Sequence, residues 1–140
     1  MIDLATKEVV GHALSRSPNT KLTLAALDQA IIRKKPSTNQ LMVHSDQGCH
    51  YSSHAYRSRL SALNITQSIS RRGNCWDNSV MERFFRTLKS EHLNVLSFIN
   101  HQAVIPEVEN YIAFYNYKRR HSGLNYITPH EQYVQMKKVA

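Results

Sequence analysis

Hydrophobic positions in the opening part of the chain predict a pair of strands followed by a helix. Residues 1–14 have the pattern of one strand's end, a turn at residues 5–7 and a second strand. Residues 23–35 place leucine and isoleucine at helical spacing, with Thr23 as the candidate N-cap. Because proline cannot continue a helix, Pro36 marks its predicted end.

The next segment follows the order strand, helix, strand. The short apolar run QLMVHSD, residues 40–46, ends in a glycine turn and is typical of a buried strand in a parallel sheet. Residues 53–64 predict a helix capped by Ser53 and stopped at Asn64. ITQSIS, residues 65–70, reads as the next strand. This alternation predicts an α/β fold.

Beyond these strands the pattern is helical. One helix follows the loop RRGNCWDN, residues 71–78, and another spans residues 100–117, where Pro106 predicts a kink or a late start. We predict an α/β core over residues 1–95 and a helical extension of the same domain over residues 96–140.

Composition and charge narrow the class of partner. With 140 residues and 41% hydrophobic content, the chain can bury the core of one domain and is not expected to be disordered. Its formal net charge of +8 points toward a polyanion such as nucleic acid. The positive charge gathers in local clusters at residues 33–35, 71–72 and 118–120 rather than in a tail.

Cysteine usage and hydropathy indicate a reducing compartment. Cys49 and Cys75 match neither a zinc-ligand spacing nor a disulfide framework, so we expect buried or half-buried thiols. No apolar run approaches the ~18–20 residues that span a bilayer, and the first residues lack the pattern of a signal peptide. We predict a cytoplasmic protein with no membrane partner.

Asp46 stands where an apolar strand enters a turn, and two roles fit that position. In open α/β sheets, the crevice at the carboxyl ends of strands is the usual place for ligand chemistry. Aspartate also stabilises turns by bonding to its own backbone, and Ser-Asp-Gln-Gly is a suitable turn sequence. The residues around Asp46 leave both roles open.

Glu82 lies in a helical segment rich in arginine, lysine and phenylalanine, and its role depends on where that helix begins. If Ser79 is the N-cap, Ser79 and Glu82 form a capping box that occupies the carboxylate. If Asp77 or Asn78 is the N-cap, Glu82 lies deeper in the helix and its side chain is free.

The predicted helix has a charged edge opposite an apolar face. At about 100° per residue, Glu82, Arg86 and Lys89 share that edge. On a solvated helix they would form an ordinary i,i+4 pair worth a few tenths of a kcal/mol. On a phosphodiester enzyme the acid would hold a divalent cation and the bases would meet phosphates, with Arg71 and Arg72 reaching the same backbone.

Two neighbouring features have ordinary explanations. His44, His50 and His54 flank Asp46, but their placement follows no standard zinc spacing. Trp76 fits either packing beneath the loop or stacking on a base, and packing is the commoner fate of tryptophan.

Four segments, in order, resemble the insertion-sequence transposases, which belong to the DDE superfamily with retroviral integrases. HSDQGCHYSS and SRRGNCWDNSVMERFFRTLKSEHL are similar to the second and third acidic motifs, with 35 residues between Asp46 and Glu82. MIDLATKEVVGHAL resembles the second and third strands of that fold, and YNYKRRHSGLNYITPHEQY resembles the C-terminal motif. The resemblance implies an RNase H-like integrase-core fold that lacks its first strand.

The resemblance also implies a metal site. In the family, three carboxylates hold two Mg²⁺ or Mn²⁺ ions that serve DNA strand cleavage and strand transfer. By motif, Asp46 is the second of these acids, Glu82 is the third, and Lys89 contacts DNA near the strand end. The family's first aspartate lies ahead of the motif at which this chain starts, and Asp3 matches the end of the second strand instead.

We therefore hypothesise a fragment of a transposase catalytic core that acts near the nucleoid on transposon ends and target DNA. Because a site of two carboxylates neutralises less metal charge, cleavage should be weak or absent. One alternative is a non-catalytic module that binds DNA, itself or a full-length transposase and modulates transposition; another is an inert gene remnant. The bases predicted to contact DNA are Arg71, Arg72, Arg86, Lys89, Lys118, Arg119 and Arg120.

Overall fold

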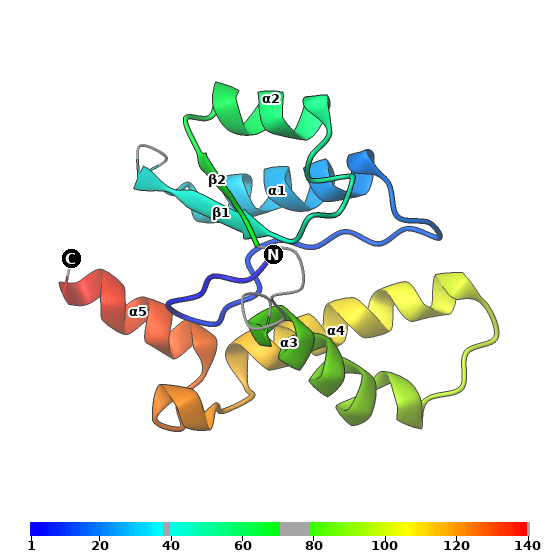
Figure 1. Cartoon of the computed structure of the whole chain (residues 1–140). Coiled ribbons are helices and arrows are strands. Elements are labelled where there is room, and N and C mark those ends of the chain that lie inside the picture. The colour runs from blue at the N-terminus through cyan, green and yellow to red at the C-terminus, as the bar shows by residue number, and fades with distance from the viewer. Residues whose placement is uncertain (38–39, 71–78, 140) are drawn as a thin grey trace. The chain divides into compact units, whose positions relative to one another are not determined.

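The computed structural model describes residues 1–37, 40–70 and 79–139, and the chain divides into two compact units. The first unit comprises Met1 and Val10–Ser79, and the second comprises Ile2–Val9 and Val80–Ala140. Figure 1 labels the helices and strands of each. Within the described residues, no helix has the length and apolar character needed to cross a membrane.

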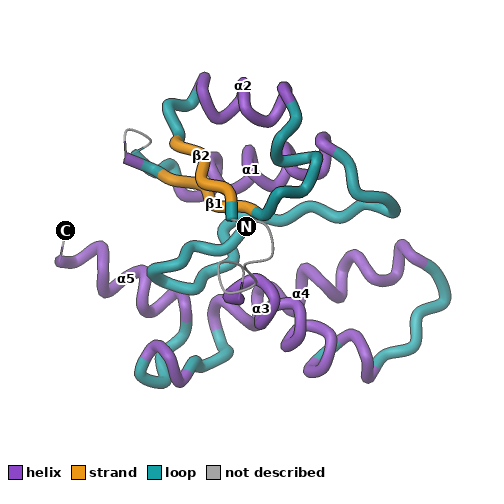
Figure 2. Tube along the Cα trace, in the orientation of Figure 1, coloured by secondary structure: helices purple, strands orange, loops and turns teal. Residues whose placement is uncertain are grey.

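The first unit combines a pair of parallel strands with helices. Its elements are α1 (Thr20–Lys34), β1 (Met42–Ser45), α2 (His54–Ala62) and β2 (Thr66–Ile69). β1 and β2 are parallel, with Met42 opposite Thr66 and Ser45 opposite Ile69, and Figure 2 shows them side by side. The buried core of this unit consists of Leu27, Val43, Tyr56, Leu60 and Ile65. The predicted order of strand, helix and parallel strand is confirmed.

Local sequence explains where these helices start. Asn19 has an extended backbone, and its side chain accepts the N–H of Leu22 at 2.9 Å, which caps α1. The prediction of Thr23 as the cap is wrong, because Thr23 lies inside the first turn and donates its hydroxyl to the carbonyl of Thr20. The apolar periodicity begins later than the helix because the first turn is polar. The predicted Ser53 cap of α2 is confirmed, since its Oγ accepts a first-turn N–H at 3.3 Å.

Residues with left-handed backbone conformation follow the C-terminal ends of α1 and α2, and a glycine allows one backbone segment to pack closely on α1. Lys35 (φ 44°) ends α1 just before Pro36, and Asn64 (φ 53°) follows α2 as predicted. A Cβ added to Gly11 would lie 2.2 Å from the carbonyl oxygen of Ala26 in α1, so only glycine allows this backbone to lie against the helix.

The second unit is helical. Its elements are α3 (Ser79–Glu91), α4 (Val104–Tyr117) and α5 (Pro129–Val139), with 3₁₀ turns at Leu93–Val95, His101–Ala103 and Ser122–Leu124. Its buried core consists of Val9, Phe84, Leu88, Val108, Tyr111, Ile112 and Tyr115. The helical character predicted for the C-terminal part of the chain is confirmed, and so is the late start of α4, while a division after residue 95 stays a prediction. Pro106 falls in the first turn of α4, where its missing N–H would have had no partner within the helix.

The predicted strand pair at residues 1–14 is present only as a turn and a single antiparallel bridge between Ile2 and Val9. The bridge is flanked by bonds from the N–H of Asp3 to the carbonyl of Glu8 at 2.9 Å and from the N–H of Val10 to the carbonyl of Met1 at 3.0 Å, so the N–H and carbonyl of Val9 face away from Ile2. On that outer edge they bond to the side chain of Asn116. Its Oδ1 accepts the N–H of Val9 and its Nδ2 donates to the carbonyl of Val9, each at 2.9 Å. An amide of α4 thus takes the place of a partner strand.

α5 begins with a capping box. The Oγ1 of Thr128 accepts the N–H of Glu131 at 3.2 Å, and the Glu131 carboxylate accepts the N–H of Thr128 at 2.7 Å. These bonds lower the pKa of Glu131. Pro129 occupies the first helical position, where its fixed φ suits the helix.

Candidate active site

Asp46 follows the last residue of β1 and is exposed, directly after the buried Ser45. Its Oδ1 accepts the N–H of Gly48 at 2.9 Å, which confirms the turn role. A Cβ on Gly48 would lie 2.9 Å from that oxygen, so glycine keeps the carboxylate in place. Within the described residues, Oδ2 of Asp46 has no hydrogen bond. The turn therefore fixes the carboxylate and leaves one oxygen for a ligand.

Glu82 lies in the first turn of α3 and is exposed. The helix begins at Ser79, so Ser79 is itself a helical residue, and the position before it lies outside the described residues. Among the residues that the structure describes, the Glu82 carboxylate forms no hydrogen bond or ion pair, and the capping box with Ser79 is not formed. The Glu82 carboxylate therefore makes no capping hydrogen bond to a described residue.

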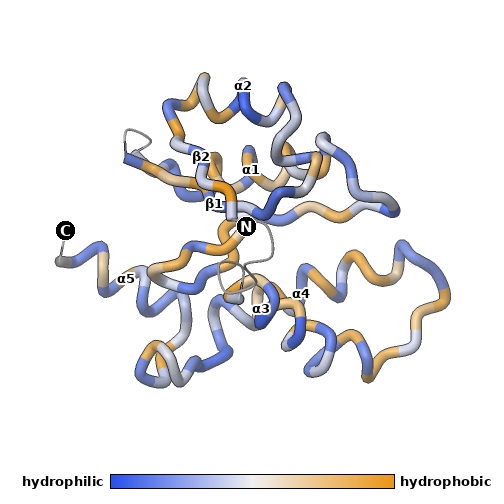
Figure 3. The backbone as a smooth tube through the Cα atoms, viewed as in Figure 1, coloured by the Kyte–Doolittle hydropathy of each residue, from blue (hydrophilic) through white to orange (hydrophobic). Residues whose placement is uncertain are grey.

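α3 has an apolar side and a charged edge, and hydrophobic and hydrophilic residues alternate along it (Figure 3). Phe84 and Leu88 are buried in the core of the second unit. Arg86 and Lys89 are exposed on the same edge as Glu82 and have no ion pair in the described part of the chain. The possible i,i+4 pair of Glu82 with Arg86 is thus not formed, which leaves an acid and two cations facing solvent.

The two predicted metal ligands belong to different units, Asp46 to the first and Glu82 to the second. Their meeting in one site stays a prediction. Arg71 and Arg72, which were expected to reach DNA from the loop before α3, lie outside the described residues, as do Trp76 and Cys75. Cys49 is exposed, so the expectation of a buried or half-buried thiol is wrong for this residue.

The basic cluster after α4 divides into free and paired side chains. Lys118 and Arg120 are exposed and have no ion pair in the described ranges. Arg119 instead forms a double contact with Glu91 at the end of α3, with Nε to Oε2 at 2.8 Å and Nη2 to Oε1 at 2.6 Å. Its guanidinium also lies 5.8 Å from the ring centroid of Tyr115. Arg119 therefore has a structural partner that Lys118 and Arg120 lack.

Glu91 is the centre of a hydrogen-bonded cluster that sequence reasoning missed. The hydroxyl of Tyr111 donates to Glu91 at 2.7 Å, beside the two bonds from Arg119. The bond from Arg119 lowers the pKa of Glu91, and burial together with the bond to Glu91 raises the pKa of Tyr111 to about 12. Glu91 and Arg119 are 28 positions apart, so no local pattern could pair them.

The chemistry of the acids fits a hard cation. Carboxylate oxygens are ligands that Mg²⁺ and Mn²⁺ prefer. Within residues 1–37, 40–70 and 79–139, no group of at least three histidine, cysteine or acidic side chains could hold a metal ion. The histidines near Asp46 have other partners: Nδ1 of His44 lies 2.9 Å from Oγ of Ser68, and Nδ1 of His54 lies 3.5 Å from Oγ of Ser58.

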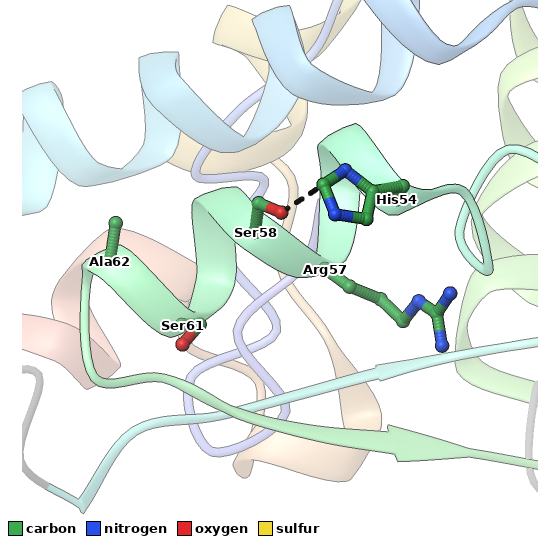
Figure 4. Close-up of a pocket in the computed structure, with 5 residues that line it drawn as sticks. All are labelled: His54, Arg57, Ser58, Ser61 and Ala62. Carbon is green, nitrogen blue, oxygen red and sulfur yellow. Dashed lines mark hydrogen bonds between the residues drawn. The ribbon is translucent and has the colours of Figure 1, made fainter.

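A shallow hollow of about 610 Å³ lies on the outer side of α2. Figure 4 shows the residues that line it, which are His54, Arg57, Ser58, Ser61 and Ala62. It contains no carboxylate and is formed by one helix, so it is not a candidate active site.

Comparison with known proteins places these residues in a family. Two models described as integrase core domain match the chain, one over residues 1–75 and the other over residues 63–129. The transposase for insertion sequence element IS904 of Lactococcus lactis is 39% identical over 91% of this chain and 51% of its own length. The putative transposase InsK for IS150 of Escherichia coli is 40% identical over 94% of this chain and 46% of its own length.

The chain spans about half the length of these curated relatives. Among solved structures, the catalytic core domain of BIV integrase superposes with a TM-score of 0.65 at 20% identity, over 89% of this chain and 77% of that one. This likeness shows the predicted RNase H-like fold. The chain belongs to the integrase core domain family, together with the insertion-sequence transposases of the DDE superfamily.

Proposed function

We propose that this chain is part of a transposase catalytic core for metal-dependent DNA strand cleavage and strand transfer. The observation that carries the proposal is the exposed edge of α3, where the Glu82 carboxylate, free within the described residues, lies beside Arg86 and Lys89. An acid in the first turn also interacts favourably with the helix dipole, but this needs no fixed partner and leaves the carboxylate oxygens of Glu82 available for an ion.

In this proposal Asp46 and Glu82 hold Mg²⁺ or Mn²⁺. A bound ion of this kind would activate a water or a DNA 3′-hydroxyl and stabilise the leaving oxygen. The Gly48 turn orients Asp46 through Oδ1 and leaves Oδ2 for the ion. The first turn of α3 presents Glu82, and the exposed position of both acids admits a DNA strand.

The bases supply the phosphate contacts. Arg86 and Lys89 would meet the backbone beside the metal ligands, and Lys118 and Arg120 would extend the contact. Arg119 remains a predicted DNA contact, although its guanidinium is already bonded to the Glu91 carboxylate. DNA at the transposon ends and target, acted on in the cytoplasm at the nucleoid, is the proposed partner, together with a second copy or a full-length transposase.

The second candidate function is DNA binding with little or no strand cleavage. With only Asp46 and Glu82 assigned, less of the metal charge is neutralised, so we expect little cleavage from the chain alone. The free cations on α3 would still bind DNA, and the chain would then modulate transposition without cutting. A chain that neither cuts nor binds DNA would instead be an inert remnant.

The test compares Glu82→Gln and Lys89→Ala in duplex binding and in nicking with Mg²⁺ or Mn²⁺. Glu82→Gln should abolish any nicking and keep or improve metal-free affinity, because it removes a negative charge that faces phosphates. Lys89→Ala should weaken binding to all sequences and flatten the log-log salt dependence by about 0.9. Matched controls are Glu109→Gln on the exposed side of α4 and Lys7→Ala, whose ammonium donates to the carbonyl of Leu4 at 2.7 Å. If the salt slope of Lys89→Ala equals that of the unmodified chain, α3 does not face DNA.

A further inference from the structure

A row of aromatic rings runs from the end of α4 along α5, on elements that carry none of the proposed metal ligands. The ring of Tyr117, the last residue of α4, lies 4.7 Å from the ring of His130, centroid to centroid. The His130 ring lies 6.1 Å from that of Tyr133, and Nζ of Lys137 lies 5.2 Å from the Tyr133 ring centroid. We call Tyr117, His130, Tyr133 and Lys137 the aromatic row.

The aromatic row keeps ring surface in solvent. Tyr117 is 50% exposed and the His130 side chain is 39% exposed, while Tyr133 is half-buried. By contrast, Phe84 and Tyr115 in the core of the same unit have their rings 5.0 Å apart and are almost fully buried. A row of rings that served only to pack α5 against α4 would be expected to bury its faces in the same way.

Positive charge surrounds the aromatic row. The exposed cations on or next to its elements are Lys118, Arg120, Lys137 and Lys138. The nearby acids Glu8 and Glu131 offset only part of this positive charge. Glu8 is buried and faces Nδ1 of His130 at 3.7 Å, and Glu131 uses its carboxylate to cap α5 through the N–H of Thr128.

We propose that the aromatic row is a binding site for single-stranded DNA, with bases stacked on Tyr117 and Tyr133 and phosphates held by the flanking cations. Aromatic side chains interleaved with lysine and arginine bind unpaired strands without sequence preference, because every base has a π-face. In a duplex these faces are covered by neighbouring base pairs, so the row should select unpaired strands. The site goes beyond the proposed function, since it uses neither Asp46 nor Glu82 and selects unpaired strands, although it shares Lys118 and Arg120 with the proposed backbone contact.

The experiment measures the affinity of the full chain for a labelled oligo-dT and for a duplex of equal length by fluorescence anisotropy. Tyr117→Leu and Tyr133→Leu keep apolar bulk but remove the π-face, so each should weaken oligo-dT binding by about fivefold or more. The duplex affinity should stay unchanged. Phenylalanine at the same positions retains the π-face and should bind oligo-dT as the unmodified chain does. Tyr126→Leu is the control, because Tyr126 is 69% exposed and makes no ring contact within the described residues. Thermal melts of each variant establish that it is folded.

Two results would overturn the proposal. In one, folded leucine variants bind oligo-dT as tightly as the phenylalanine variants do, while Lys137→Ala alone weakens binding; the surface would then be purely electrostatic. In the other, the leucine variants lose oligo-dT and duplex affinity equally. The duplex measurements with Lys89→Ala test the α3 site separately from the aromatic row. Either proposal can therefore be contradicted while the other is supported.

Discussion

At the scale of single residues, the charged side chains fall into those that have a partner within the protein and those that have none among the described residues. Glu91 accepts three hydrogen bonds, two from Arg119 and one from Tyr111, so its charge serves the packing of α3 against α4. Glu82, one acid earlier on the same helix, has no such partner in the described ranges. The difference could not be predicted from residue type, because both acids stand among arginines and lysines. It depends on which bases the fold brings close.

The Glu91 cluster leads to a pH-dependent prediction. Glu91→Gln should lower the free energy of unfolding at neutral pH by less than about 1 kcal/mol, because the Glu91 side chain is 37% exposed and its ion pair is partly screened. The folded-state pKa of Glu91 is lowered from its ordinary 4.5. Its contribution is therefore present above pH 4.5 and is lost as pH falls through the lower folded-state pKa. Urea unfolding from pH 7 to pH 3 should show the free energies of unfolding of the unmodified chain and of Glu91→Gln converging. Glu109→Gln should have the same free energy of unfolding as the unmodified chain throughout. A gap that stays constant down to pH 3 would contradict the assignment.

At the scale of elements, local sequence signals predicted the order of elements and several helix ends, but they could not predict contacts made by residues distant in sequence. The β1–α2–β2 order, the Ser53 cap and the late start of α4 follow from neighbours in sequence. The strand pair at residues 1–14 is reduced to a single bridge, and the outward-facing backbone groups of Val9 bond to Asn116, 107 positions away. No periodicity or turn signal near Val9 carries that information.

The Asn116 contact can be tested by substitution. Asn116 is fully buried and satisfies both the N–H and the carbonyl of Val9. Asn116→Ala would leave two buried backbone groups without partners, so we expect a loss of about 2 kcal/mol or more in the free energy of unfolding. Asn110→Ala, an exposed asparagine on the same helix, should cost far less. The measurement is urea denaturation of both variants, and equal losses would show that the two bonds contribute little.

At the scale of the whole molecule, positive charge is distributed unevenly between the units. The first unit has nine lysines and arginines against three acids, and the second has nine against seven. Within the first unit Asp28 is paired with Arg59 at 2.8 Å, whereas Asp46 has no ion pair among the described residues. The acidic motifs name Asp46 and Glu82 as the candidate site, and this assignment stays a prediction. The motifs could not predict that Asp46 and Glu82 belong to different units, because residue spacing says nothing about which segments pack together.

Whether Asp46 and Glu82 act together is a question about both units at once, and Mn²⁺ answers it without DNA. An ion that binds only the folded chain stabilises it by RT ln(1 + c/Kd), where c is the free ion concentration, so at a fixed Mn²⁺ concentration Tm rises more when the ion binds more tightly. If both carboxylates hold the same ion, Asp46→Asn and Glu82→Gln should each remove most of the Mn²⁺-dependent rise, and the double variant should remove no more. The asparagine side chain keeps an acceptor for the N–H of Gly48, so Asp46→Asn tests the charge and not the turn. Glu109→Gln, the control, should leave the rise intact. Because coupled ligands give non-additive effects and separate sites give additive ones, a double variant that loses the sum of two partial effects would mean that the two acids bind metal separately.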